Sequence, residues 1–301
     1  MWHHATGVLA LDQPRILGII NVTPDSFSDG GAFFSPTDAL TRGGLLIAEG
    51  ADVLDVGGES TRPHATVQVP AAEELKRVVP VIEALRARFP SVPISIDTVK
   101  SEVAAAALRA GASIINDVSA FRLDPAMAGV AARSRAGVIL MHSRGDVRDM
   151  ATFVHARYGE DVVEDVIAEL RDRIADAQRA GVEHERIVID PGVGFSKRST
   201  HSLAVLAGIS RLLTLGFPVV IGASRKRFIG EITGVAVPGE RLAGTIAAHV
   251  AALDRGARLF RVHDVKAHRQ ALDVAWAIAV AGSGKREAGV GSRKPRAGNS
   301  E

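Results

Sequence analysis

Residues 189–197 read Ile-Asp-Pro-Gly-Val-Gly-Phe-Ser-Lys, an apolar strand that ends on a carboxylate and continues into a glycine-rich loop. Seven other short apolar runs in the chain also lead into polar side chains. The first polar residues after these runs are Asn21, Asp55, Asp97, Asn116, His142, Ser224 and Arg261. Amphipathic stretches long enough for helices separate the runs. This alternation predicts parallel strands joined by crossover helices.

Eight strand–helix units of similar spacing predict a single (β/α)8 barrel, the TIM-barrel fold. Strands of a parallel sheet are covered on both faces and read as unbroken apolar runs, and the functional residues of a barrel collect where its strands end. The alternative is an open doubly wound sheet, which follows the same carboxyl-end rule but rarely needs eight such units.

The length of 301 residues and the hydrophobic content of 47% allow a large core, and the regular spacing favours one domain. We predict a catalytic barrel over residues 1–281 and a disordered basic tail over residues 282–301. The tail holds five cationic and two acidic side chains, a net charge of +3, so the rest of the chain, which totals +2 with the tail, carries −1. A nucleic-acid role for the barrel is therefore disfavoured. The tail is expected to be solvated, with weak contact to polyanions as the alternative.

The chain has no cysteine, which excludes disulfides, thiol nucleophiles and thiolate metal sites. The absence of cysteine also agrees with a cytoplasmic location. We find no apolar run of signal-peptide length near the start and none of the ~18 residues that a membrane span needs. The ten histidines show no zinc-like spacing, and we expect His3 and His4 to be terminal residues without a role. These features predict a cytosolic protein with small-molecule substrates that binds neither membrane nor nucleic acid.

Asp97, Asn116 and Asp190 end three of the predicted strands and should meet at one mouth of the barrel. Two carboxylates and an amide can accept hydrogen bonds from adjacent ring N–H and amino groups, so a flat pterin-like or guanine-like heterocycle is the expected ligand. Each residue alone could instead cap the helix that follows it.

Cations gather at the last two strand ends. Arg225, Lys226 and Arg227 follow the seventh strand, while Arg261 and His263 share one side of the eighth. The loops after strands seven and eight often bind phosphate in this barrel, so we predict an anion site there, with a solvated basic rim as the alternative. Because these cations and the heterocycle acceptors come from different strands, we expect two separate subsites.

Two long loops complete the predicted mouth. Residues 21–31 read Asn-Val-Thr-Pro-Asp-Ser-Phe-Ser-Asp-Gly-Gly, and Phe27 there has no evident core role. Residues 59–64 read Glu-Ser-Thr-Arg-Pro-His and are also long enough to move. Such loops can close over a site and exclude water.

Together these segments resemble the dihydropteroate synthases, folate-pathway enzymes that join 6-hydroxymethyl-7,8-dihydropterin diphosphate to para-aminobenzoate and release diphosphate. The resemblance covers about residues 14 to 280. It rests on seven blocks in family order: residues 21–31, 55–63, 95–97, 115–117, 190–195, 224–226 and 261–263.

The resemblance implies a role for each site residue. The implied pterin-binding residues are Asp97, Asn116, Met141, Asp190, Phe195 and Lys226. The implied diphosphate residues are Asn21, Arg261 and His263, with Asn21 also near a Mg²⁺ cofactor. Those bordering the aminobenzoate are Thr61, Arg62, Pro63 and Ser224, with Phe27 and Asp29 closing over it. The catalytic set is then Asn21, Phe27, Asp29, Lys226, Arg261 and His263. The resemblance also implies a dissociative reaction and a sulfonamide target, and we expect a homodimer.

The chain departs from the family pattern at His64, Ser143, Ser196 and Arg227, and His64 and Arg227 put sulfonamide sensitivity in question. Two alternatives share the heterocycle acceptors. A methyltetrahydrofolate-dependent corrinoid methyltransferase would have little use for the clamp formed by Lys226, Arg261 and His263. A non-catalytic pterin-binding paralogue would have lost the clamp or the first loop.

Overall fold

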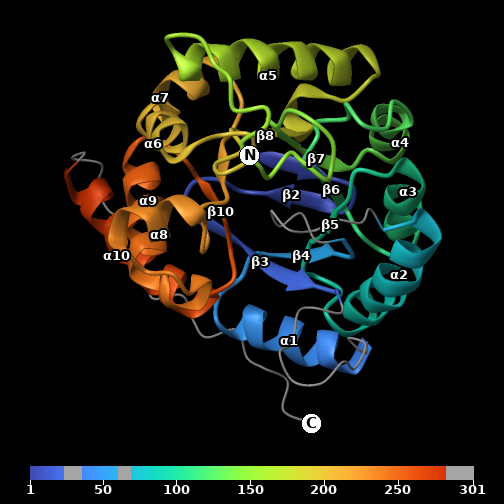
Figure 1. Cartoon of the computed structure of the whole chain (residues 1–301). Coiled ribbons are helices and arrows are strands. Elements are labelled where there is room, and N and C mark those ends of the chain that lie inside the picture. Colours follow the sequence, from blue (N-terminus) through green and yellow to red (C-terminus); the bar gives the residue numbers. More distant parts are fainter. Residues whose placement is uncertain (24–35, 60–68, 283–301) are drawn as a thin grey trace.

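The computed structural model describes residues 1–23, 36–59 and 69–282 of the chain (Figure 1). The predictions for Phe27, Asp29, Thr61, Arg62, Pro63 and His64 and for the tail after Gly282 lie outside the described residues. The strands are β1 (Trp2–His4), β2 (Gly7–Leu9), β3 (Arg15–Asn21), β4 (Val53–Gly57), β5 (Ile94–Asp97), β6 (Ile114–Asp117), β7 (Gly137–Met141), β8 (Ile187–Asp190), β9 (Val220–Ile221) and β10 (Leu259–Val262). The α-helices are α1 (Pro36–Ala48), α2 (Ala71–Arg88), α3 (Ser101–Arg109), α4 (Ala126–Ser134), α5 (Val162–Arg179), α6 (Ser199–Ala207), α7 (Ile209–Leu212), α8 (Arg227–Thr233), α9 (Leu242–Asp254) and α10 (Val265–Gly282).

Eight parallel strands form the barrel, which confirms the predicted (β/α)8 fold. Their order is β8-β7-β6-β5-β4-β3-β10-β9, and each neighbouring pair is parallel. The two ends of this order meet where Ile189 forms a parallel bridge with Val219 and its N–H donates to the Pro218 carbonyl at 3.0 Å. The sheet therefore closes on itself, which an open doubly wound sheet does not.

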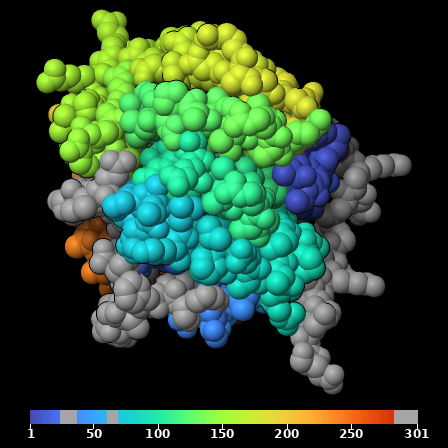
Figure 2. All heavy atoms as spheres, turned by 90° about the vertical axis from the view of Figure 1, so that its right-hand side faces the viewer, coloured from blue at the N-terminus to red at the C-terminus, as the bar shows by residue number. Residues whose placement is uncertain are grey.

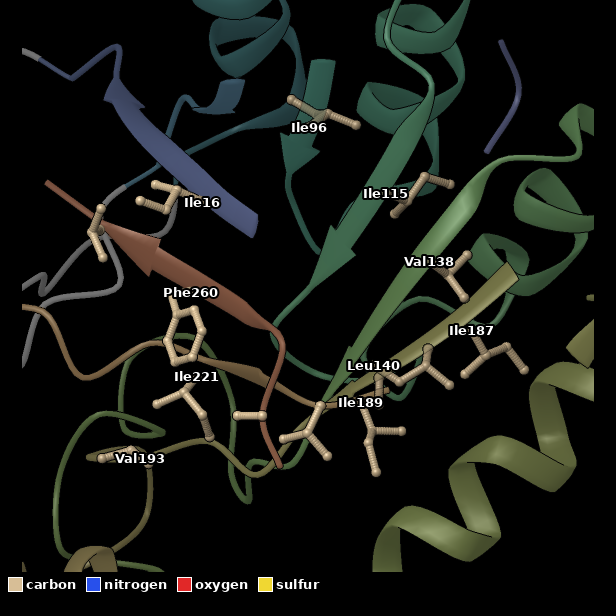
Figure 3. Close-up of a cluster of buried hydrophobic side chains, with 14 of the residues drawn as sticks. Ile16, Ile96, Ile115, Val138, Leu140, Ile187, Ile189, Val193, Ile221 and Phe260 are labelled. Atoms are coloured by element: carbon tan, nitrogen blue, oxygen red, sulfur yellow. The ribbon is translucent and has the colours of Figure 1, made fainter. Parts of the chain in front are cut away.

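Helices surround the barrel (Figure 1). Outward-facing side chains of the strands are buried in the core that the helices share. Successive helices α2, α3 and α4 pack side by side over one flank (Figure 2). Figure 3 shows the apolar side chains of this outer core, among them Ile96, Ile115, Leu140 and Phe260. The core is continuous around the barrel, as expected for strands buried on both faces.

A short β-hairpin that the sequence did not predict closes the amino-terminal end of the barrel. Strands β1 and β2 pair antiparallel, and the Trp2 side chain is fully buried with Leu17, Ile139 and Leu259 of the barrel interior. The Trp2 indole N–H donates to the Arg186 carbonyl at 2.8 Å. The hairpin is thus a floor that seals the end opposite the predicted mouth.

The expectation that His4 is a terminal residue without a role is wrong. His4 is a buried residue of β1, and burial together with the nearby Arg86 lowers its pKa to about 4. Its neighbour Trp2 supplies the apolar surface that draws this segment into the barrel. In the part of the chain that the structure describes, no helix is both long and apolar enough to cross a bilayer.

Candidate active site

The period of two along a β-strand carries the site residues to the barrel mouth. Five interior residues of the floor layer lie on β4, β6, β7, β8 and β10: Val53, Ile114, Ile139, Val188 and Leu259. Two positions further along the same strands stand Asp55, Asn116, Met141, Asp190 and Arg261. Because alternate residues face the same side of a strand, the apolar floor layer requires these five side chains to project into the mouth.

The mouth contains a cavity of about 580 Å³. Seven of its lining residues were predicted as site residues: Asn21, Asp97, Phe195, Ser224, Lys226, Arg261 and His263. A deeper pocket of about 30 Å³ adjoins it and is lined by Asn116, Met141 and Asp190, with Phe195, Lys226 and Arg261 shared between the two spaces. The structure therefore brings together the predicted site residues that lie in the described part of the chain.

Arg261 joins the two predicted subsites instead of lying apart from the acceptors. Its Nε donates to Asp55 at 2.6 Å and its Nη2 donates to Asp97 at 2.6 Å. Burial alone would lower the pKa of Arg261, but the two carboxylates raise it above its ordinary value. The prediction of two separate subsites is therefore wrong for Arg261. Its side chain on β10 contacts Asp97 on β5 across the barrel interior.

Asp55 is a site residue that the sequence analysis did not assign. Its side chain is fully buried, and both of its oxygens lie 3.5 Å from the Asn116 amide nitrogen. Its signal in the sequence was a carboxylate directly after the apolar pair Val53 and Leu54, and in the structure it lies in the middle of β4. Asp55 therefore orients both Arg261 and Asn116 from below, and a ligand would meet those two residues first.

Two acceptor carboxylates, Asp97 of the wider cavity and Asp190 of the deep pocket, are held in a low-dielectric setting. Burial raises the pKa of Asp97 to about 7, and the ion pair with Arg261 opposes this rise. Burial also raises the pKa of Asp190, against a hydrogen bond from the Gly192 N–H at 2.7 Å and the nearby Lys226. Perturbed carboxylates in a cleft are characteristic of functional sites.

Lys226 lies directly over the face of Phe195, with its Nζ 3.8 Å from the ring centroid. Burial and the neighbouring Arg261 lower the pKa of Lys226 to about 8. The pocket of about 30 Å³ holds little more than one water molecule. A bicyclic ring could therefore enter only after Lys226 moves off Phe195, which its flexible four-carbon stem permits.

The predicted anion residues gather around Ser224. The hydroxyl of Ser224 lies 2.9 Å from His263 Nδ1, and its oxygen accepts from the His263 backbone N–H at 3.3 Å. Arg225 instead forms an ion pair with Asp264 at 2.6 Å, so its charge is partly neutralised. The guanidinium of Arg227 lies 3.8 Å from the centroid of the Phe153 ring at the rim. Arg261, Lys226 and His263 thus line the cavity together with Arg225 and Arg227.

The described residues contain no group of three or more His, Cys, Asp or Glu side chains arranged to hold a metal ion. Asn21 ends β3, is half-buried and lines the cavity. Mg²⁺ is usually bound through one or two protein oxygens together with water and substrate phosphates. The donor set around Asn21 fits a magnesium ion delivered with a phosphorylated ligand and does not fit a cage made of protein alone.

A larger cavity of about 1180 Å³ lies at the other end of the barrel, between the hairpin, α1 and the end of α2. It is lined by Arg15, Asp52 and Phe89 among others, and Asp52 is already bonded to Arg15. In parallel barrels the chemistry lies at the carboxyl ends of the strands. We therefore assign the active site to the smaller cavity at the mouth.

Comparison with known proteins agrees with this geometry. A family model described as "Pterin binding enzyme" matches residues 17–263. The dihydropteroate synthase of Escherichia coli (strain K12) is 42% identical over 278 residues, which cover 92% of this chain and 96% of that protein. The corresponding enzyme of Synechocystis is 43% identical over 267 residues, covering 87% of this chain and 89% of the relative.

Solved structures give the same result. The dihydropteroate synthase of Xanthomonas albilineans with 4-aminobenzoic acid superposes with a TM-score of 0.83 at 49% identity, covering 90% of this chain and 95% of that one. The enzyme in complex with 7,8-dihydropteroate gives a TM-score of 0.80 at 47% identity, with the same coverage. From the extent of these matches and the residues gathered at the mouth, we conclude that the chain belongs to the pterin binding enzyme family, alongside its dihydropteroate synthases.

Proposed function

We infer that this protein is a dihydropteroate synthase, a transferase of folate biosynthesis. It condenses 6-hydroxymethyl-7,8-dihydropterin diphosphate with para-aminobenzoate and yields 7,8-dihydropteroate and diphosphate. The observation that carries this function is the contact of Arg261 with Asp97 and Asp55, which joins acceptors for a heterocycle to a cation suited to an anionic leaving group. The identities of 42–49% with dihydropteroate synthases favour this reaction over corrinoid methyl transfer and over a non-catalytic role.

The deep pocket is proposed to bind the pterin ring. Asp97, Asp190 and the Asn116 amide oxygen accept hydrogen bonds from the ring N–H and amino donors. Met141 and Phe195 line the faces of the ring, since both border the pocket. Lys226 moves from the Phe195 face to the ring edge when the ligand enters.

The wider cavity is proposed to hold the diphosphate and the arylamine. Arg261 and His263 stabilise the negative charge that develops on the departing diphosphate, and fixed donors in a closed mouth do this without reorganisation. Ser224 orients His263 through the contact of 2.9 Å and borders the aminobenzoate. An aniline nitrogen is neutral at pH 7, so the nucleophile needs placement more than activation. From the family resemblance we propose that Thr61, Arg62 and Pro63 border the aminobenzoate and that Phe27 and Asp29 close over it.

We propose Mg²⁺ as the cofactor, held by the Asn21 oxygen, by water and by the substrate diphosphate. When bound it would neutralise part of the diphosphate charge. Asn21 ends the strand beside β10, which places it on the same side of the mouth as Arg261.

We further propose a cytoplasmic homodimer that binds neither membrane nor nucleic acid. Val274 and Ile278 lie one turn apart on α10 and are 62% and 68% exposed. Contiguous exposed apolar side chains often mark a subunit interface. Light scattering should give twice the chain mass, and Ile278→Glu should shift the protein toward a monomer.

A diphosphate-release assay with both substrates, with and without Mg²⁺, tests the function. Release that requires both the pterin diphosphate and para-aminobenzoate is expected. Release without the arylamine would indicate a hydrolase, and no release despite binding of both substrates would indicate a non-catalytic protein.

A further inference from the structure

Lys197, a buried lysine that lines the mouth cavity, has no role in the proposed chemistry. Lys197 follows the β8 loop and is 1% exposed. Its Nζ lies 2.8 Å from His142 Nδ1 and 3.2 Å from the Phe195 carbonyl oxygen. Buried lysines are rare unless their charge has a partner, so this position needs an explanation.

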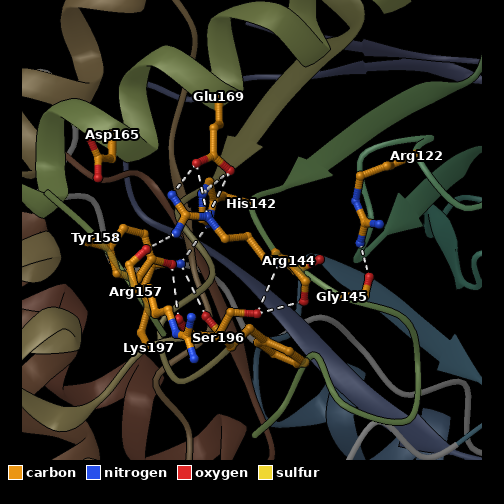
Figure 4. A network of polar contacts seen from close by, with 12 residues as sticks. Arg122, His142, Arg144, Gly145, Arg157, Tyr158, Asp165, Glu169, Ser196 and Lys197 are labelled. Carbon is orange, nitrogen blue, oxygen red and sulfur yellow. Dashed lines mark hydrogen bonds and ion pairs between the residues drawn. The ribbon is translucent and has the colours of Figure 1, made fainter. Parts of the chain in front are cut away.

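A chain of hydrogen bonds leads from Lys197 to helix α5 (Figure 4). His142 Nε2 lies 3.1 Å from a Glu169 carboxylate oxygen, and Arg144 Nε donates to the same carboxylate at 3.0 Å. Because an ionised carboxylate can only accept, Nε2 carries the imidazole proton and Nδ1 accepts from Lys197. Burial and the nearby Lys197 lower the pKa of His142 to about 4, so the ring is neutral at pH 7.

Glu169, at the other end of this series of hydrogen bonds, is ionised at pH 7. Burial would raise the pKa of Glu169, but hydrogen bonds from His142 and Arg144 outweigh it and hold the pKa at about 2. The direction of donation is therefore fixed from Lys197 through His142 to Glu169. A fixed direction makes Lys197 a donor to both of its partners.

The loop after β8, which Lys197 contacts, has an unusual backbone conformation. Gly192, Gly194 and Ser196 have φ values of 69°, 79° and 48°, three left-handed residues in alternation. A Cβ at Gly192 would lie 1.9 Å from the His142 carbonyl oxygen, so the loop also approaches β7 closely there. Ser196 carries a side chain in this region, where such backbone is strained, and its hydroxyl bonds the Arg144 backbone at 2.8 and 3.0 Å.

We propose that Lys197, anchored by His142 and Glu169, is a positioning residue for the pterin substrate. The inference rests on the proposed function and extends it. Lys197 donates a hydrogen bond to the Phe195 carbonyl and so holds the β8 loop in place. The position of this loop fixes the position of the Phe195 ring, which lines the deep pocket. Its hydrogen bonds are made to His142 and to the backbone carbonyl of Phe195.

The charge of Lys197 gives this role a pH signature. Burial lowers the pKa of Lys197 to about 7, while Asp190 and Glu169 oppose that shift. The titratable and charged groups around it come from β7, α5, β8, α6 and the adjoining loops: His142, Arg144, Tyr158, Glu169, Asp190, His201 and Lys226. As Lys197 loses its proton above pH 7, its bond to Phe195 changes from charge-assisted to neutral and weakens.

Calorimetry with 6-hydroxymethylpterin and, separately, with inorganic diphosphate and Mg²⁺ tests the proposal on the full chain. Lys197→Met keeps the volume and removes the donor, and Lys266→Met, at an exposed site on α10, is the matched control. We expect the pterin Kd of K197M to rise about tenfold, the typical effect of a charge-assisted hydrogen bond, with the diphosphate Kd unchanged within twofold. The pterin Kd of K197M divided by that of the wild type should also fall toward one as the pH is raised from 6 to 9.

A pterin Kd of K197M within twofold of wild type, or equal losses for both ligands, would overturn the proposal. If K197M does not fold, His142→Leu removes the anchor from the same lysine and should raise the pterin Kd at least threefold, and no rise would overturn it. Wild-type protein that binds no pterin would instead overturn the proposed function together with this inference.

Discussion

Replacing Asp97 by Asn should weaken pterin binding by removing one negative charge from the deep end of the mouth. Arg261 Nη2 loses its ion pair of 2.6 Å with Asp97 but keeps its bond to Asp55. The guanidinium is therefore not left unpaired, and most of the loss falls on the ligand. A hydrogen bond to a charged acceptor contributes about 1.5–3 kcal/mol, which corresponds to a Kd about 10- to 150-fold higher.

The pKa of Asp97 predicts how this effect depends on pH. Burial raises this pKa from 3.8 to about 7, so the wild-type carboxylate is mostly ionised at pH 8 and mostly protonated at pH 6. Asparagine does not titrate. The ratio of the D97N Kd to the wild-type Kd should therefore fall about tenfold from pH 8 to pH 6, while other titrating groups cancel from the ratio.

Calorimetry with 6-hydroxymethylpterin measures both quantities. Asp117→Asn is a matched control, because Asp117 also ends a strand and is buried, yet it accepts from the Ser119 N–H at 2.7 Å and faces away from the mouth. The control should lower the melting temperature and leave the pterin Kd within threefold. A D97N Kd within threefold of wild type at pH 8, or a ratio that does not change with pH, would refute the assignment of Asp97.

Arg261→Ala should weaken both pterin and diphosphate binding and lower stability, because breaking a buried ion pair costs about 3–5 kcal/mol. Calorimetry measures the two affinities and urea denaturation the stability, and loss of diphosphate binding alone would contradict the prediction. Trp2→Ala should destabilise the protein by about 3–5 kcal/mol in urea denaturation, since it empties the floor of the barrel, with little effect on pterin Kd; a change below about 1 kcal/mol would mean that the floor is not packed as described. Between pH 7 and pH 10 the unfolded chain binds more protons at Lys197 than the folded chain does, so Lys197 makes the folding stability rise with pH. The melting temperature of K197M should therefore rise less than that of the wild type over this range. An equal rise would show that Lys197 does not have the lowered pKa. Deleting residues 283–301 should leave activity and melting temperature almost unchanged, and a large fall in either would show that this segment contributes to the fold.

The barrel could be predicted from sequence because its signal is local and repeated. Each strand is an apolar run that ends on a polar residue, and Asp97, Asn116 and Asp190 follow from that pattern alone. The hairpin did not show this pattern, since its strands have three residues each and Trp2 is buried by barrel residues far along the chain.

Pairings between distant residues were the part of the site that sequence could not supply. Asp55 and Arg261 lie 206 positions apart, and only closure of the barrel brings them to 2.6 Å. Lys197 follows Gly and Ser residues and would be expected in an exposed loop, yet its burial depends on His142 and Glu169 from other elements. The chemistry of single strand ends was therefore predictable, while the contacts that tune it were not.

The most direct test of the central claim is product analysis of a single reaction. The protein is incubated with 6-hydroxymethyl-7,8-dihydropterin diphosphate, para-aminobenzoate and Mg²⁺, and both dihydropteroate and diphosphate are quantified by chromatography. The account predicts one dihydropteroate for each diphosphate released, with both absent when either substrate is omitted. Diphosphate without dihydropteroate, or neither product under conditions where calorimetry shows both substrates bound, would contradict it.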